Sequence, residues 1–281
     1  MYARSAARLI PRMPSFDLSG RVAVVTGGYG VLGGCLAAGL AAAGACVAIL
    51  GRRRDAAESM AERLRGDGRD AIALVADVLD EPQLRVARDE LLRARGTIDI
   101  LVNAAGGNVA RARNDTTSIF DVPTDAFDEA LRLNLHGTVT PTMIFGAAMA
   151  ERGRGSVVNI SSMAAVRVLS GVLAYSVAKT GIDSFTRWMA VELARKHGDG
   201  LRVNAIAPGF FISEQNRTVL VAPDGSHTPR ASAVLRQTPM GRFGRPEELI
   251  GAVQWLCSDA ASFVTGAVIP IDGGFSAFSG V

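Results

Sequence analysis

Short apolar runs separated by longer stretches of helical composition restrict the fold of this chain more than any other feature. Several runs are rich in Val and Ile, and they lack the polar alternation of strands that face water on one side. Strands buried on both faces have this composition, as in a parallel sheet covered by helices. The runs occupy residues 21–26, 45–50, 71–76, 98–103, 156–161, 201–207 and 267–271.

The segments between these runs have the composition of helices. Residues 55–65 and 81–95 are charged on one face, whereas residues 126–150 and 174–196 are longer and more apolar. The repeated order of strand and helix predicts a single-domain α/β Rossmann fold, a doubly wound sheet of seven parallel strands with helices on both faces. A chain of 281 residues, 48% of them hydrophobic, is long enough for one such core.

Composition excludes several classes of protein. A formal net charge of +3, with no basic stripe and interleaved aromatic residues, does not indicate a nucleic-acid binder. The sequence contains no run of 18 apolar residues that would predict a membrane span, and we expect a cytoplasmic protein. Cys35, Cys46 and Cys257 lack the spacing of a disulfide framework or zinc site and are predicted to be small core residues. The three His show no ligand spacing, so no metal is expected.

Two segments stand apart from the regular alternation. Residues 1–15 contain Arg4, Arg8 and Arg12 without an acidic neighbour, and we expect a basic tail before a domain that spans residues 16–281. A targeting peptide is the alternative, but the apolar stretch is too short for a secretory signal. Residues 208–246 show little periodicity and follow the end of a strand, which predicts a substrate lid.

A glycine-rich turn follows the first predicted strand and opens an alanine-rich helix. Glycines let the backbone approach a pyrophosphate closely, and the helix N-terminus holds negative charge with its free N–H groups and its dipole. A tight turn without a ligand is the alternative, and the position directly after the first buried strand disfavours it. The residues predicted to line this site are Gly27, Gly30, Val31, Leu32 and Gly33.

The ends of the next strands extend the predicted cofactor site. An acidic residue at the end of the second strand binds the ribose 2′-hydroxyl of NAD, and a basic residue suits the 2′-phosphate of NADP. This strand ends in Gly51 and Arg52, so the sequence favours NADP(H), with NAD(H) as the alternative. Further residues expected along the same crevice are Asp77, Val78, Asn103, Ala104 and Gly106.

A candidate chemical centre lies in the second half of the chain. Tyr175 and Lys179 are four residues apart at the start of a predicted helix and therefore share one face. A lysine cation favours the phenolate and lowers the tyrosine pKa, which allows proton exchange with a substrate oxygen. Ser162, at the end of the fifth predicted strand, can donate a hydrogen bond to the same oxygen.

Taken together, these motifs resemble the short-chain dehydrogenases/reductases over about residues 16–281. The resemblance implies a nicotinamide cofactor and a homotetramer. It implies that Tyr175 is the acid/base, that Lys179 binds the nicotinamide ribose and lowers the tyrosine pKa, and that Ser162 holds the substrate oxygen. Asn134 would anchor a water in a proton relay. The matching positions are Thr26-Gly27, Gly33, Asn103-Ala104-Ala105-Gly106, Asn134, Ser162, Tyr175, Lys179 and Pro208-Gly209.

The same resemblance extends the cofactor site and shows one departure. Pro208 and Gly209 would lie beside the nicotinamide, and Ser213 stands where a carboxamide-binding threonine is common. Val31 occupies the position of the family's middle glycine, and Gly30 comes one residue early. This departure affects the expected pyrophosphate geometry more than the expected cofactor.

A narrower resemblance points to a sugar-acid branch of the family, the D-mannonate oxidoreductase or fructuronate reductase branch. It implies reduction of the keto group of D-fructuronate and the reverse reaction. The lid supplies polar partners for a polyol carboxylate, and an arginine can bind the carboxylate with two hydrogen bonds. The candidate substrate residues are Asn108, Ser162, Tyr175, Gln215, Asn216 and Arg217, with His227 and Arg230 as further polar lid residues.

Two alternatives remain open at this point. The first is a short-chain reductase of another small molecule, such as a 3-oxoacyl thioester or a different sugar. The second is a regulator that senses the cofactor without catalysis, which the presence of both Tyr175 and Lys179 disfavours.

Overall fold

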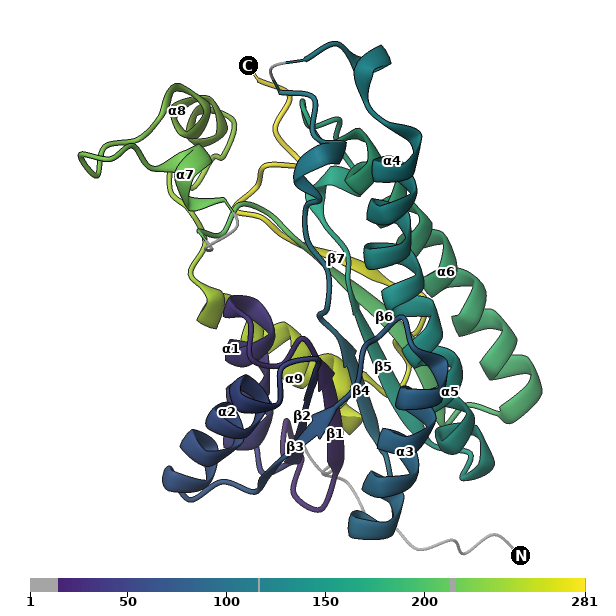
Figure 1. Ribbon diagram of the computed structural model, residues 1–281. Coiled ribbons are helices and arrows are strands. Elements are labelled where there is room, and N and C mark those ends of the chain that lie inside the picture. The colour runs from purple at the N-terminus through teal and green to yellow at the C-terminus, as the bar shows by residue number, and fades with distance from the viewer. Residues whose placement is uncertain (1–14, 116, 213–215, 281) are drawn as a thin grey trace, which may run out of the picture.

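A parallel sheet of seven strands forms the centre of the computed structural model, which describes residues 15–115, 117–212 and 216–280 (Figure 1). The strand order is β3-β2-β1-β4-β5-β6-β7, and every neighbouring pair is parallel. The predicted doubly wound fold is therefore confirmed. The strands are β1 (Val22–Thr26), β2 (Cys46–Gly51), β3 (Ala71–Val75), β4 (Ile100–Asn103), β5 (Gly155–Ile160), β6 (Leu201–Pro208) and β7 (Val268–Ile271).

Helices cover both faces of the sheet (Figure 1). In β1, Ala23 and Val25 pack into one hydrophobic cluster, whereas Val22 and Val24 pack into the other. Because alternate residues point to opposite faces, both sets must be apolar, which explains the continuous apolar runs. The first face carries α1 (Val31–Ala42), α2 (Arg54–Gly66) and α9 (Ile250–Cys257), and the second carries α3 (Glu81–Arg95), α5 (Gly137–Glu151) and α6 (Leu173–His197).

The expected helix over residues 126–150 is wrong in one respect. It consists of α4 (Thr124–Leu131), a π-helical turn over Arg132–His136 and α5. The Thr138 hydroxyl donates to the main-chain oxygen of Asn134, four residues earlier. The turn lies within one continuous stretch of helical residues, so a helical pattern over the whole stretch does not reveal it.

The segment predicted to be a lid, residues 208–246, contains more regular structure than its sequence predicts. It forms α7 (Arg217–Leu220) and α8 (Pro229–Arg236), which project beyond the sheet at the upper left of Figure 1. The Thr228 hydroxyl accepts a hydrogen bond from the N–H of Ala231, and Pro229 follows in the first turn. The Thr228-Pro229 pair is a signal for the start of a helix, and it is independent of hydrophobic periodicity.

Short 3₁₀ turns complete the description. They lie at Ala110–Ala112, Ile119–Asp121, Met163–Ala165, Pro246–Leu249 and Asp259–Ala261.

Leu18 is fully buried and joins the hydrophobic cluster beneath α1. The basic tail expected over residues 1–15 falls almost entirely outside the described residues and stays a prediction. Cys46 and Cys257 are buried as predicted, but Cys35 on α1 is only partly buried. Among the described helices, none has the length and apolar character needed to cross a membrane.

Candidate active site

The glycine turn between β1 and α1 has the shape of an anion cradle. Gly27 has a φ of +62°, in the left-handed region that favours glycine. A Cβ on Gly33 would lie 2.3 Å from the Gly27 oxygen, so only glycine lets the helix start this close to the turn. Gly30 is the N-cap of α1 and offers no side chain to the first N–H groups, which remain for a ligand. The turn therefore fits a pyrophosphate although Val31 replaces the usual glycine.

Arg52 and Asp77, predicted separately, lie together at the ends of β2 and β3. The Arg52 guanidinium is 3.7 Å from the Asp77 carboxylate, and 71% of the arginine side chain is exposed. Val78 is buried and faces Gly137, at the start of α5. An exposed, loosely paired guanidinium of this kind can turn to a bound phosphate at little cost.

Asn103 lies inside the protein and does not face the crevice with its side chain. Its amide donates to the Thr142 hydroxyl at 2.8 Å and to the Asn159 side chain at 2.9 Å. At the end of the neighbouring strand β1, the Thr26 hydroxyl accepts hydrogen bonds from the N–H groups of Ala104 and Ala105, both at 3.1 Å. These bonds fix the ends of β1, β4 and β5 relative to one another.

Asn134 attaches the π-helical turn to the chain after β4. Its Oδ1 accepts from the Gly107 N–H, and its Nδ2 donates to the oxygens of Gly107 and Ala130, each at 2.9 Å. The side chain is fully buried. Asn134 thus has a structural task that the sequence did not reveal, because it fixes the Gly106–Gly107 backbone beside the Lys179 ammonium.

Tyr175, Lys179 and Ser162 converge from α6 and the end of β5. The Lys179 ammonium lies 5.4 Å from the centre of the Tyr175 ring and donates to the Ile160 oxygen at 2.6 Å. Ser162 lies close enough to the Tyr175 hydroxyl to lower its pKa, and its own hydroxyl accepts a hydrogen bond from the N–H of Ala164 at 3.1 Å. The three side chains that the sequence singles out therefore meet at one point.

Burial controls the protonation of this centre. It raises the pKa of Tyr175, and the hydrogen bond to Ser162 acts in the opposite direction. Burial also lowers the pKa of Lys179 to about 8, against the attraction of Asp183. The pKa of Tyr175 is therefore shifted in the opposite direction to the lowering expected from Lys179, because desolvation of the phenolate is the largest effect on this group.

Asp183 and Ser161 belong to the same centre but were missed in the sequence. The Ser161 hydroxyl donates to the Asp183 carboxylate at 2.5 Å, and both side chains are buried. Burial raises the pKa of Asp183, and Arg187 and Lys179 oppose this change. The spacing of Tyr175, Lys179 and Asp183 by four residues was the available signal, since it aligns them on one helix face.

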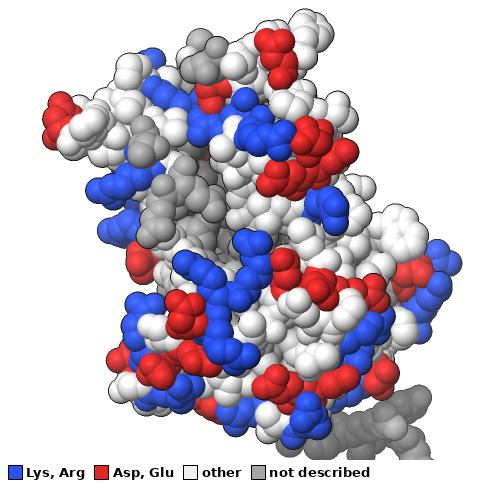
Figure 2. Space-filling model, viewed as in Figure 1, with Lys and Arg blue, Asp and Glu red and all other residues white. Residues whose placement is uncertain are grey.

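The candidate substrate residues are less closely grouped. Asn108 and Arg217 are exposed, and the Asn216 amide donates to the Phe211 oxygen at 2.8 Å. Ser213 and Gln215 lie outside the described residues. Figure 2 shows this side of the molecule hollowed, with basic side chains along the borders of the hollow.

Two other polar lid residues are bound to protein partners. Arg230 on α8 donates to the Ser170 oxygen at 2.9 Å and lies 3.2 Å from the Asp115 carboxylate. The His227 ring packs edge-on against Phe243, with ring centres 5.6 Å apart. Arg230 therefore ties the lid to the loops that follow β4 and β5.

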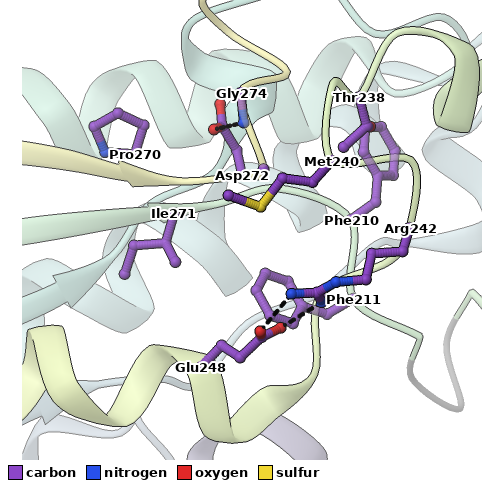
Figure 3. A pocket seen from close by; sticks show the side chains of 12 residues that line it. Phe210, Phe211, Thr238, Met240, Arg242, Glu248, Pro270, Ile271, Asp272 and Gly274 are labelled. Atoms are coloured by element: carbon purple, nitrogen blue, oxygen red, sulfur yellow. Dashed lines mark hydrogen bonds and ion pairs between the residues drawn. The ribbon is translucent and has the colours of Figure 1, made fainter.

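A cavity of about 400 Å³ lies between the base of the lid and the end of β7 (Figure 3). Phe210, Phe211 and Met240 supply apolar walls, and Arg242 forms an ion pair with Glu248 at 2.7 Å. Arg242 holds the pKa of Glu248 at about 2. Tyr175, Lys179 and Ser162 do not line this cavity, so it is separate from the reacting centre.

Comparison with known proteins agrees with this geometry. A family model described as enoyl-(acyl carrier protein) reductase matches residues 30–276. An uncharacterized oxidoreductase of Bacillus subtilis is 41% identical over 275 residues, which cover 94% of this chain and 98% of the relative. This chain belongs to the short-chain dehydrogenases/reductases. Members of the family are NAD(P)-dependent oxidoreductases, and this protein is therefore one of them.

Other relatives of this dehydrogenase/reductase act on polyols and sugar acids according to their names. D-threitol dehydrogenase of Mycolicibacterium smegmatis is 36% identical and covers 93% of this chain and 95% of the relative. A Haemophilus structure with bound NAD, provisionally described as a D-mannonate oxidoreductase, has a TM-score of 0.88 at 39% identity and covers 94% and 98% of the two chains. A gluconate 5-dehydrogenase of Burkholderia cenocepacia with NADP and tartrate has a TM-score of 0.84 at 34% identity and covers 93% and 97%.

Proposed function

We propose that this oxidoreductase interconverts a ketone and a secondary alcohol of a sugar acid, with D-fructuronate and D-mannonate as the pair. The observation that carries the proposal is the meeting of the Tyr175 and Ser162 hydroxyls beside Lys179, at the edge of the sheet below the lid. One hydroxyl that can give a proton and one hydrogen-bond donor at a single point are what the reduction of a carbonyl requires.

In the proposed reduction, Ser162 donates a hydrogen bond to the carbonyl oxygen and polarises it. A bound nicotinamide cofactor supplies the hydride to the carbonyl carbon. Tyr175 gives its proton to the oxygen, so that ketone, hydride and proton together make the alcohol. The raised pKa of Tyr175 keeps this proton in place at neutral pH. Lys179, with a pKa of about 8, can return a proton to the tyrosine.

For the cofactor, we propose NADP(H) in preference to NAD(H). Support comes from the exposed Arg52, which follows Gly51 at the end of β2 in the place of the acidic residue that binds the ribose hydroxyl in NAD sites. The turn around Gly27 and Gly33 would hold the pyrophosphate, and Pro208 and Gly209 would lie beside the nicotinamide. Among similar structures, one binds NAD and another binds NADP, so direct measurement on this chain must decide the preference.

We further propose that the protein is a homotetramer, as in the family that it resembles. Trp188 and Val191 of α6 are 65% and 59% exposed, and Met143 of α5 is 55% exposed. Large exposed apolar side chains on neighbouring helices support the proposal that another copy of the chain packs against this surface. Light scattering on the purified protein measures the assembly directly, and a monomer would contradict this proposal.

For the substrate, support comes from the polar lid and from the names of the relatives. Arg217 is exposed on the lid and carries the charge that a substrate carboxylate needs. The names of similar proteins include gluconate 5-dehydrogenase and a structure that holds tartrate, a hydroxylated dicarboxylate. A 3-oxoacyl thioester is the second candidate, since a 3-oxoacyl-carrier-protein reductase of Aquifex aeolicus is 35% identical over 259 residues.

The test is a substrate panel read by the absorbance of the reduced nicotinamide. D-fructuronate, 5-keto-D-gluconate and an acetoacetyl thioester are offered with NADPH and with NADH, and D-mannonate with the oxidised cofactors. We expect the highest kcat/KM for D-fructuronate with NADPH. Turnover of the thioester with no turnover of any sugar acid would overturn the proposal in favour of the second candidate.

A further inference from the structure

The Tyr29 side chain lies where a side chain of residue 51 would stand. A Cβ on Gly51 would be 2.3 Å from Cε1 of Tyr29 and 2.7 Å from its hydroxyl oxygen. Gly51 is buried at the end of β2 and does not have a positive φ. Its backbone would therefore accept other residues, and the tyrosine ring is what requires glycine at this position.

The ring is fixed from both sides. It packs against the hydrophobic cluster beneath α1 and α2, and the Arg53 guanidinium lies 5.0 Å from its centre on the solvent side. The Arg53 N–H also donates to the Tyr29 hydroxyl at 3.3 Å. Within the described part of the chain, no acceptor takes the proton of this hydroxyl, so the proton can be donated to a ligand.

The surroundings of the hydroxyl favour an anion. Arg52, Arg53 and Arg54 follow β2 in succession. Arg52 is loosely paired with Asp77 at 3.7 Å, and Arg54 pairs within its own helix with Glu58 at 3.4 Å. The turn between β1 and α1 and the end of β2 lie side by side in the sheet, because Thr26 pairs with Leu50 (Figure 1). A phosphate at this point would meet a phenol donor and two guanidinium groups.

We infer that Tyr29 determines cofactor specificity in two ways. Its ring occupies the space that a carboxylate at position 51 would need to bind the ribose 2′-hydroxyl of NAD. Its hydroxyl donates a hydrogen bond to the 2′-phosphate of NADP, together with Arg52 and Arg53. The inference rests on the proposed NADP(H) preference and adds Tyr29 as the residue that disfavours an NAD-type site at position 51.

The test uses two probes that need no turnover, adenosine 2′,5′-bisphosphate and 5′-AMP, whose dissociation constants are measured by calorimetry. Tyr29→Phe keeps the ring and removes the hydroxyl. We expect about tenfold weaker binding of the bisphosphate, the usual effect of losing a hydrogen bond to a charged group, and 5′-AMP binding within about twofold of the wild type. An equal change for both probes would overturn the role of the hydroxyl.

The steric role is tested with Gly51→Asp in two backgrounds. With Tyr29 present, the new carboxylate has no room, and we expect weaker binding of both probes. In the Tyr29→Ala background, the same substitution should improve 5′-AMP binding relative to the bisphosphate. Equal effects in the two backgrounds would overturn the steric role. A wild-type protein that binds both probes equally would contradict the NADP(H) preference itself. The comparison of Gly51→Asp with and without Tyr29 would still test the contact between residues 29 and 51.

Discussion

Lys179 makes the stability of this protein depend on pH in a window that the structure defines. Burial lowers its pKa from the ordinary 10.5 to about 8 in the folded chain. Between these values, the unfolded chain binds the proton and the folded chain does not, so stability rises with pH across the window. One pKa unit corresponds to about 1.36 kcal/mol. The free energy of unfolding should therefore increase by about 3 kcal/mol from pH 8 to pH 10.5, and this increase should be lost progressively as the pH falls from 10.5 to 8.

Other groups also titrate in alkali, so the prediction concerns a difference between proteins. Urea unfolding is followed at several pH values for the wild type and for Lys179→Met, and the pH-dependent rise should disappear in the variant. Lys196→Met is the matched control, because this lysine lies exposed at the end of the same helix beside Glu192. If the difference in the free energy of unfolding between wild type and Lys179→Met does not change from pH 8 to pH 10.5, the desolvation of Lys179 that the structure indicates is contradicted.

Three further predictions concern the cofactor site and its support. Asn134→Ala removes the three hydrogen bonds of a buried side chain, two of them to Gly107, and should lower the free energy of unfolding by about 3 kcal/mol; an unchanged urea midpoint would contradict this. Arg52→Ala should raise the dissociation constant for NADPH about tenfold and leave that for NADH nearly unchanged; equal changes would remove Arg52 as a phosphate ligand. Gly33→Ala places a Cβ 2.3 Å from the Gly27 oxygen and should abolish binding of both cofactors in calorimetry, whereas wild-type affinity would show that the turn can relax.

Much of the fold could be predicted because its signals are local. Each buried strand is a continuous apolar run, and the helix at Glu81–Arg95 has the predicted bounds because Asp80 caps its start and Gly96 ends it. The four-residue spacing of Tyr175 and Lys179 likewise put both on one helix face. Local pattern was sufficient wherever one element alone fixed the geometry.

What escaped prediction depends on contacts between segments distant in sequence. The contact of Tyr29 with Gly51, and the tie of Arg230 to Asp115, join segments that no periodicity relates. The raised pKa of Tyr175 depends on how many protein atoms surround it, which the spacing of Lys179 could not indicate. These properties depend on packing between distant segments. They determine the protonation of Tyr175 and the cofactor specificity, and they have less effect on the overall fold.

In the proposed reaction, Tyr175 supplies the proton during the reduction of a sugar-acid ketone. The most direct test compares wild type and Tyr175→Phe in the turnover of D-fructuronate with NADPH, alongside cofactor binding measured by calorimetry. Loss of the proton donor should lower kcat by about 10²- to 10⁴-fold, with the NADPH dissociation constant within about twofold of the wild type, because the phenyl ring fills the same space as the tyrosine ring. Turnover of the variant at a rate similar to the wild type would contradict the assignment.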